Sequence, residues 1–128
     1  MTQKESIRHW KQGAQDAIEA AELLQRNGKH ALALFHCHLT AEKILKAQYI
    51  AEKDAAPPKT HNLLNIALEL SKSLLEDEKE QQRELTTFAF KARYEDVEWD
   101  GRDEALQNAD WWIRIVRTLI THYDHEEG

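Results

Sequence analysis

The residues best suited to acid–base or metal chemistry gather in the second quarter of the chain. His38 and Glu42 are four residues apart, so on a helix they share a face. Together with His61 they would supply two nitrogens and a carboxylate, a set that zinc accepts. His36 lies two residues from His38 and would point away from it. The alternative is a buried hydrogen-bonded pair of His38 and Glu42 that fixes helix packing, and since no spacing matches a zinc signature, we predict no metal and no cofactor.

A second group of residues is cationic. Lys43 and Lys46 are three residues apart, Lys59 and His61 follow in or near a loop, and Arg93 lies in another loop. If these side chains converge, they form a small groove suited to phosphate, which a histidine near a helix N-terminus would reinforce. The alternative is that the lysines lie on a solvent-exposed face, with their stems covering apolar neighbours.

Helices must position these side chains. The chain has 128 residues with only four Gly and two Pro, and strong helix formers dominate it. We therefore expect one all-α domain over residues 1–128, an up-and-down antiparallel bundle of four to five helices. Apolar periodicity predicts five helical segments, namely 6–25, 30–52, a third carrying leucines from 63 to 74, 81–92, and a last one after Gly101.

Local signals mark the breaks between these segments. Asn27-Gly28 should end the first helix, and Pro57-Pro58 cannot continue the second. Thr60 is the expected N-cap of the third helix. Residues 76–80 are charged and predict a solvated bend or helix surface, whereas residues 93–101 predict an ordered loop.

Composition also limits the class of protein. A single cysteine, Cys37, fits a reducing cytosol, and no apolar segment reaches the roughly 20 residues that span a bilayer. The polar start, with no apolar core behind it, indicates no signal peptide. We expect a cytoplasmic protein without membrane contact. The net charge of -6 disfavours sequence-independent binding of nucleic acid, although a local basic groove remains compatible with it.

Four segments carry a recognisable pattern. Residues 35–47 read Phe-His-Cys-His-Leu-Thr-Ala-Glu-Lys-Ile-Leu-Lys-Ala, residues 58–63 contain Thr-His, residues 93–96 read Arg-Tyr-Glu-Asp, and Trp10 precedes Asp16 and Ala20 in the first helix. In this order and spacing the chain resembles the HEPN family of bacterial helical-bundle proteins. Glu95 stands where the family's Arg-Tyr-Pro-Asp element has proline.

The resemblance implies a helical module that homodimerises and acts beside a minimal nucleotidyltransferase in toxin–antitoxin-like pairs. Short members of the family have been proposed to bind nucleotides, so nucleotide or RNA is a candidate ligand. We expect a nucleotide or phosphate to contact these residues: Lys43, Lys46, Lys59, His61, Arg93 and Tyr94.

The alternative function that the resemblance implies is that of a metal-independent dimeric ribonuclease with an Arg-x(4–6)-His motif in each protomer. After Arg93 the histidine is missing, because positions 98–100 are Glu, Trp and Asp. Arg117 and His122 satisfy the motif as candidate catalytic residues, with His in acid–base work and Arg stabilising charge on phosphate. Such residues lie about 140° apart around a helix axis, and the alternative is a solvated helix end. The missing histidine favours the binding module over the enzyme.

Trp111 and Trp112 are adjacent and about 100° apart on a helix, so both cannot enter one core. We expect one of them in the core and the other in a dimer contact, where Trp is enriched.

Overall fold

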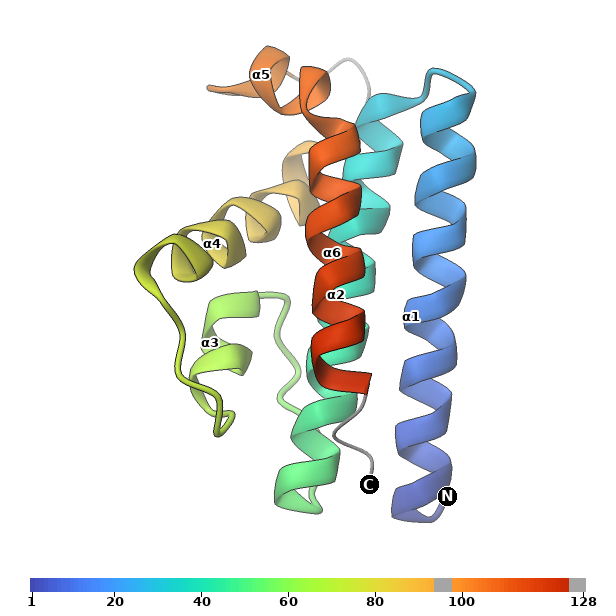
Figure 1. Ribbon diagram of the computed structural model, residues 1–128, viewed down its shortest axis with the longest axis vertical. Coiled ribbons are helices and arrows are strands. Elements are labelled where there is room, and N and C mark those ends of the chain that lie inside the picture. The colour runs from blue at the N-terminus through green and yellow to red at the C-terminus, as the bar shows by residue number, and fades with distance from the viewer. Residues whose placement is uncertain (94–97, 125–128) are drawn as a thin grey trace.

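The computed structural model describes residues 1–93 and 98–124 (Figure 1). In these residues it contains helices and no strand, which confirms the all-α class. The helices are α1 (Gln3–Arg26), α2 (His30–Lys53), α3 (Leu63–Leu68), α4 (Glu76–Lys91), α5 (Arg102–Gln107) and α6 (Ala109–Asp124). Figure 1 shows α1, α2 and α6 as long neighbouring helices, with α4 running across them and α3 beneath α4.

Helix α2 is the central element of the molecule. It packs against every other helix. More than half of its residues are buried, and these lie all around the helix, so its sequence shows little amphipathic contrast. The core that it shares with its neighbours includes Ile18, Leu34, Ile44, Leu45, Leu85, Phe88 and Val116.

The ends of α1 follow local rules. Thr2 and Glu5 form a capping box, in which the Glu5 N–H donates to Thr2 Oγ1 and the Thr2 N–H donates to Glu5 Oε1, both at 3.1 Å. Gly28, with φ of 75°, follows the C-cap residue Asn27 in the left-handed conformation that glycine favours. The turn predicted at these two residues is confirmed.

Helix α3 is shorter than its leucine pattern predicts. The predicted segment continues to Leu74, but α3 ends at Leu68. Beyond it, the Ser71 backbone N–H and hydroxyl donate to the Glu52 carboxylate at 2.9 and 3.1 Å. This long-range contact replaces the helical hydrogen bond that Ser71 would otherwise make.

The last two predicted segments also differ in their limits. Of the two alternatives predicted for residues 76–80, a solvated bend or a helix surface, the structure shows the helix: α4 begins at Glu76, because three acidic side chains suit the positive end of a helix. The Glu78 carboxylate also accepts the Leu75 N–H at 2.9 Å. The helix predicted after Gly101 is divided at Asn108 into α5 and α6.

The two adjacent tryptophans divide between core and surface. Trp112 is 6% exposed and packs edge-on against Phe88, with ring centroids 5.3 Å apart. Trp111 is 40% exposed. Within the described residues, no helix is long and apolar enough to cross a membrane.

Candidate functional site

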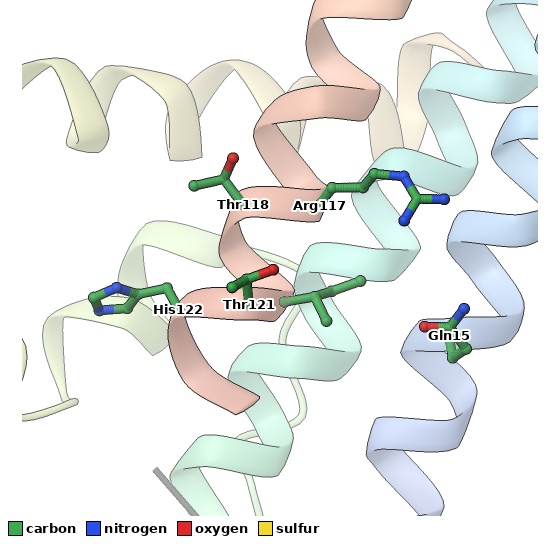
Figure 2. A pocket seen from close by; sticks show the side chains of 6 residues that line it. Gln15, Arg117, Thr118, Thr121 and His122 are labelled. Carbon is green, nitrogen blue, oxygen red and sulfur yellow. The ribbon is translucent and has the colours of Figure 1, made fainter. Parts of the chain in front are cut away.

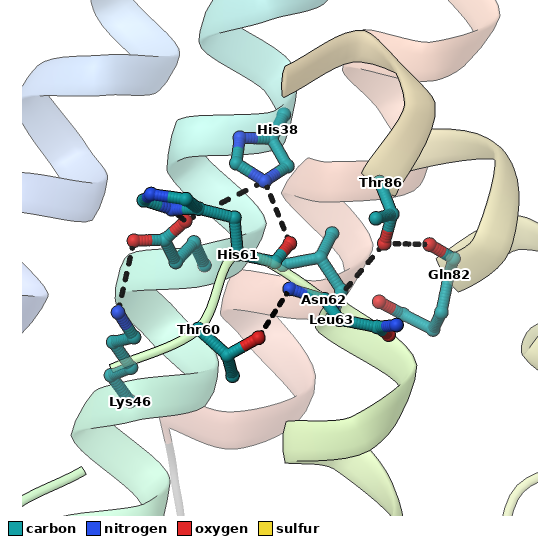
Figure 3. A network of polar contacts seen from close by, with 9 residues as sticks. His38, Lys46, Thr60, His61, Asn62, Leu63, Gln82 and Thr86 are labelled. Carbon is teal, nitrogen blue, oxygen red and sulfur yellow. Dashed lines mark hydrogen bonds and ion pairs between the residues drawn. The ribbon is translucent and has the colours of Figure 1, made fainter. Parts of the chain in front are cut away.

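A buried carboxylate, Glu42 of α2, organises the most connected polar cluster in the described residues (Figure 3). Its Oε1 accepts a hydrogen bond from His61 Nδ1 at 2.8 Å, and its Oε2 accepts one from Lys46 Nζ at 3.1 Å. His38 Nε2 lies 3.5 Å from Oε1 and 3.2 Å from the backbone carbonyl of His61. His38, Glu42 and Lys46 are spaced by four residues, so one face of α2 presents all three.

The connection between α2 and α3 carries His61, and two hydrogen bonds hold it where it enters α3. The Leu63 N–H donates to Thr86 Oγ1 of α4 at 3.1 Å, and the Asn62 N–H donates to Thr60 Oγ1 at 3.1 Å. The N-cap of α3 is Asn62, whose side chain accepts the Asn65 N–H at 3.2 Å. The sequence predicts Thr60 as this cap, but Thr60 lies two residues too early and instead turns the chain into the helix.

His38 is held as a neutral imidazole. Its side chain is 1% exposed, and burial lowers its pKa against the opposing effect of the hydrogen bond to the His61 carbonyl. Because Nε2 faces two oxygen acceptors, it carries the proton and donates. Nδ1 is then a buried lone pair, and it has no partner among the described residues.

Glu42 is held as a carboxylate. Burial alone would raise its pKa, but the hydrogen bonds from His61 and Lys46 outweigh burial and keep the pKa below its usual value. The side chains of Glu42 and Lys46 are 9% and 8% exposed, so the charges form a buried pair. Such a pair is retained only when hydrogen bonds satisfy both partners, as they do here.

The Glu42 carboxylate also fixes the orientation of His61. Since Nδ1 faces a carboxylate, Nδ1 carries a proton, and Nε2 becomes the outer nitrogen of the ring. The His61 side chain is 61% exposed. In the neutral ring Nε2 accepts a proton, and in the protonated ring it donates a hydrogen bond to an anion.

Helix α1 contributes Trp10 to the same region. Lys43 Nζ lies 5.6 Å and Lys46 Nζ 5.5 Å from the centroid of the Trp10 ring, within the range of a cation–π contact. Gly13, one turn along α1, leaves room for the Lys43 stem, because a Cβ there would lie 3.1 Å from Lys43 Cδ. Lys43 is partly buried and pairs with no carboxylate within the residues that the structure describes.

Further aromatic rings continue the cluster on the other side. His38 stacks against Phe35 at 6.5 Å, and the guanidinium carbon of Arg93 lies 5.1 Å from the Phe35 ring. His61 contacts the edge of Phe90 with a centroid separation of 6.4 Å. Phe90 lies on the exposed side of α4, near the C-terminal end of the helix. Its side chain is 64% exposed, which is unusual for so large an apolar residue.

The structure therefore brings together several of the residues predicted to bind phosphate. Contacts connect four of them in sequence. Lys43 and Lys46 share the Trp10 ring, and Lys46 and His61 share the Glu42 carboxylate. His61 in turn contacts His38, which stacks on Phe35, and Phe35 contacts Arg93. Lys46, however, is already paired with Glu42 and is buried. Lys59 is exposed in the same connection, two residues before His61. Tyr94 lies outside the described residues.

The candidate catalytic residues Arg117 and His122 lie on α6, beside an open cavity of about 660 Å³ (Figure 2). Arg117 Nε donates to Glu22 of α1 at 2.8 Å, and a second guanidinium nitrogen contacts the same oxygen. Figure 2 shows the Arg117 side chain directed toward α1 and the His122 ring directed away from it. Within one chain the two side chains do not converge.

The candidate metal ligands do meet, but as a hydrogen-bonded chain. His38 and His61 both direct protonated nitrogens at oxygen atoms, and a metal requires the lone pair of an unprotonated nitrogen. Within the described part of the chain, no group of three His, Cys, Asp or Glu side chains is arranged to hold a metal ion. The packing alternative, a pair of His38 and Glu42, describes the arrangement better. Cys37 is buried nearby in the core, which raises its pKa to about 12 and leaves it a neutral thiol.

Two residues of this region give no sign of a binding site in the sequence. Trp10 reads as an ordinary apolar position of an amphipathic helix, and Phe90 lies in a helix whose other aromatic residue, Phe88, is fully buried. A helical wheel of α4 would have separated the two phenylalanines, because residues two apart point about 200° from each other.

Comparison with known proteins gives the fold a family. The chain matches the HEPN domain family over residues 7–123. Its structure is similar to the crystal structure of TT1696 from Thermus thermophilus, with a TM-score of 0.66 and 23% identity over 88% of this chain and 96% of that one. At this identity the similarity establishes the fold alone. No curated protein matches the chain.

Proposed function

The chain belongs to the HEPN domain family, and we propose that it is a binding module that holds a nucleotide at the surface formed by Lys43, His61, Phe90 and Arg93. The observation that carries the proposal is the exposed His61 ring, fixed by a buried carboxylate between cationic and aromatic side chains. These four residues are called the His61 surface below.

The cations of the His61 surface supply the recognition of phosphate. Lys43 and Arg93 contact aromatic rings, and no carboxylate pairs with either of them within the described residues. His61 Nε2 adds a hydrogen-bond donor when the ring is protonated. The whole chain has a net charge of -6, but the local charge is different. The negative charge of Glu42 is balanced by Lys46, so the positive charges of Lys43 and Arg93 are left to attract an anion.

Phe90 supplies a surface for the base. Its ring is exposed and meets His61 edge to face, which makes part of the ring available for stacking. Stacking of a base on an aromatic side chain is tolerant of base identity and contributes about 1–3 kcal/mol. A nucleotide therefore fits the His61 surface better than inorganic phosphate alone.

We extend the proposal to the assembly in which the module works. Membership of the HEPN family supports a homodimer that pairs with a minimal nucleotidyltransferase in a toxin–antitoxin-like system. A binding module next to a nucleotidyltransferase would present or sense the nucleotide that such an enzyme consumes.

Calorimetric titration of ATP and of pyrophosphate separates the two parts of the site. We expect Phe90→Ala to weaken ATP binding about tenfold while leaving pyrophosphate binding unchanged, since only the base contact is lost. Lys43→Met should weaken both ligands, because the phosphate contact is common to them. Lys53→Met, which removes an exposed lysine at the end of the same helix, is the matched control. No binding by the parent protein, or binding that ignores both substitutions, would contradict the proposal.

The ribonuclease alternative with Arg117 and His122 lacks a comparable observation in its favour. Arg117 is engaged by Glu22, and the two side chains point to different sides of α6. If this pair did cleave RNA, Arg117→Ala would abolish metal-independent cleavage. We expect RNA to remain intact with the parent protein.

A further inference from the structure

A buried histidine, His38 of α2, supports the exposed His61. The side chain of His38 is 1% exposed. Its Nε2 donates to the backbone carbonyl of His61 at 3.2 Å and lies 3.5 Å from Glu42 Oε1 (Figure 3). Its Nδ1 is buried and has no hydrogen-bond partner among the described residues. One nitrogen of the ring thus has two oxygen neighbours, and the other has none within this part of the chain.

His38 and Glu42 hold different parts of His61. The carboxylate of Glu42 holds the ring, because its Oε1 accepts from His61 Nδ1 at 2.8 Å. His38 holds the backbone of the same residue through the carbonyl. The two α2 residues lie about one turn apart, so together they fix both the position and the orientation of the His61 ring against that helix.

The two histidines share one carboxylate oxygen. Glu42 Oε1 is 2.8 Å from His61 Nδ1 and 3.5 Å from His38 Nε2, so His61 has the closer contact. The other oxygen, Oε2, is occupied by Lys46 Nζ at 3.1 Å. A positive charge on His38 would draw Oε1 away from His61, because a hydrogen bond between two ionised groups is stronger than one from a neutral ring. The His61 ring would then lose the contact that sets its orientation.

A proton on His38 Nδ1 would also disturb the backbone contact. A buried N–H without an acceptor is unfavourable, so the ring would turn toward an oxygen or toward solvent. Turning the ring takes Nε2 away from the carbonyl of His61. The connection before α3 would then lose its contact with α2 at this point.

The surroundings keep His38 neutral near pH 7. Burial lowers its pKa, and this effect exceeds the opposing effects of the hydrogen bond to the His61 carbonyl and of the Glu42 carboxylate. In the described residues, the charged and titratable groups around the ring are Glu42 and Lys46 of α2, His61 of the connection, and Arg93, which lies over the Phe35 ring against which His38 stacks. His38 therefore takes up a proton only in acid.

We propose that His38 positions His61 for nucleotide binding and releases the nucleotide in acid. The neutral ring holds the His61 backbone in the binding position. When Nδ1 takes up a proton, the ring leaves the carbonyl and competes for Glu42, and the His61 surface loses affinity. His38 is buried and acts through His61 rather than on the ligand. This inference rests on the proposed function, since it names how the same surface is regulated.

Two substitutions separate positioning from packing. His38→Gln keeps a donor for the His61 carbonyl but takes up no proton, whereas His38→Leu keeps an apolar bulk without a donor. In calorimetric titration with ATP at pH 7, we expect a dissociation constant within about threefold of the parent for His38→Gln and at least about tenfold higher for His38→Leu. Circular dichroism confirms that each variant is folded.

The same titrations at pH 5 test the release. ATP and His61 also titrate between pH 7 and 5, but they do so in the parent and in His38→Gln alike. The ratio of the parent's dissociation constant to that of His38→Gln therefore isolates His38, and we expect it to rise at least about threefold from pH 7 to pH 5. The matched control is His36→Gln, which removes a histidine bonded to the Leu32 carbonyl of its own helix and should follow the parent at both pH values.

The outcomes distinguish this inference from the proposed function. A parent protein that binds no ATP at pH 7 overturns both. Binding by the parent that weakens in parallel with His38→Gln as pH falls overturns the release while leaving nucleotide binding standing. His38→Leu that binds ATP as tightly as the parent overturns the positioning role, and if this variant does not fold, a weak-binding but folded His38→Gln at pH 7 overturns it equally.

Discussion

At the scale of single residues, Glu42 decides what the site can do. Its carboxylate has less than a tenth of its side-chain surface exposed, yet it receives hydrogen bonds from His61 and Lys46 and faces His38. Each bond offsets part of the free energy needed to bury the charge. In return the carboxylate fixes which nitrogen of His61 carries the proton and which one faces outward.

Removing this carboxylate should destabilise the whole fold. In Glu42→Ala the buried Lys46 ammonium loses its partner, and we expect the free energy of unfolding to fall by about 3 kcal/mol. In Glu42→Met/Lys46→Met neither charge remains, so most of the stability should return. Urea denaturation measures both values. A single variant as stable as the parent would show that the pair contributes nothing to stability.

His38 should make stability depend on pH. Burial lowers its native pKa below the ordinary value of 6.5, so the unfolded chain binds more protons below that pH. The free energy of unfolding therefore falls as pH decreases from 7 toward 5. Glu42 also makes the free energy of unfolding fall at lower pH. Its pKa in the folded protein lies below the usual 4.5, so the stability that its carboxylate contributes is lost as pH falls through that lowered pKa.

The His38→Gln variant isolates the first of these effects. Glutamine keeps a donor for the His61 carbonyl but does not titrate. Its unfolding free energy, measured in urea at pH 7, 6 and 5, should decline less than that of the parent. Parallel declines in the two proteins would assign the pH dependence to other groups.

At the scale of elements, the sequence predicted helices from local signals and missed what distant contacts impose. Asn27-Gly28 closes α1 because the turn chemistry there is local, and α2 ends at Lys53, ahead of Pro57-Pro58, which cannot continue a helix. The end of α3 depends on Glu52 of α2 capturing Ser71, which no local pattern reveals. The N-cap of α3 was predicted at Thr60 and lies at Asn62. Both residues have side chains able to cap a helix, so local sequence alone does not choose between them.

The cap of α3 can be tested with a matched pair of substitutions. Asn62→Ala removes the acceptor of the Asn65 N–H and should cost about 1 kcal/mol. Thr60→Ala removes only the bond to the Asn62 N–H ahead of the helix, and it should cost less. Thermal denaturation of the two variants ranks them. The opposite order would return the capping role to Thr60.

At the scale of the whole molecule, the candidate site is assembled from parts that no single segment reveals. Lys43, Lys46, His61 and Arg93 can be predicted from the sequence and do share one region of contacts. Trp10 of α1 and Phe90 of α4 join them only through tertiary packing. Trp10 reads as a core position from periodicity, and the period of α4 places Phe90 on the exposed side without saying what lies next to it, so their part in the site required the fold. The negative net charge of the whole chain likewise gives no indication of this local surface with its cationic side chains.

The His61 surface is built on α2, on α4 and the residues that follow it, and on the connection before α3. Figure 1 shows α6 packed along α2, with α4 extending to one side of both.

The most direct test of the His61 surface is a nuclear magnetic resonance titration of the labelled protein with ATP. We predict that the resonances of the His61 ring, the Phe90 ring and the Trp10 indole shift together with one dissociation constant, while those of His122 of α6 do not move. Shifts confined to Arg117 and His122, or no shift at millimolar ATP, would contradict it.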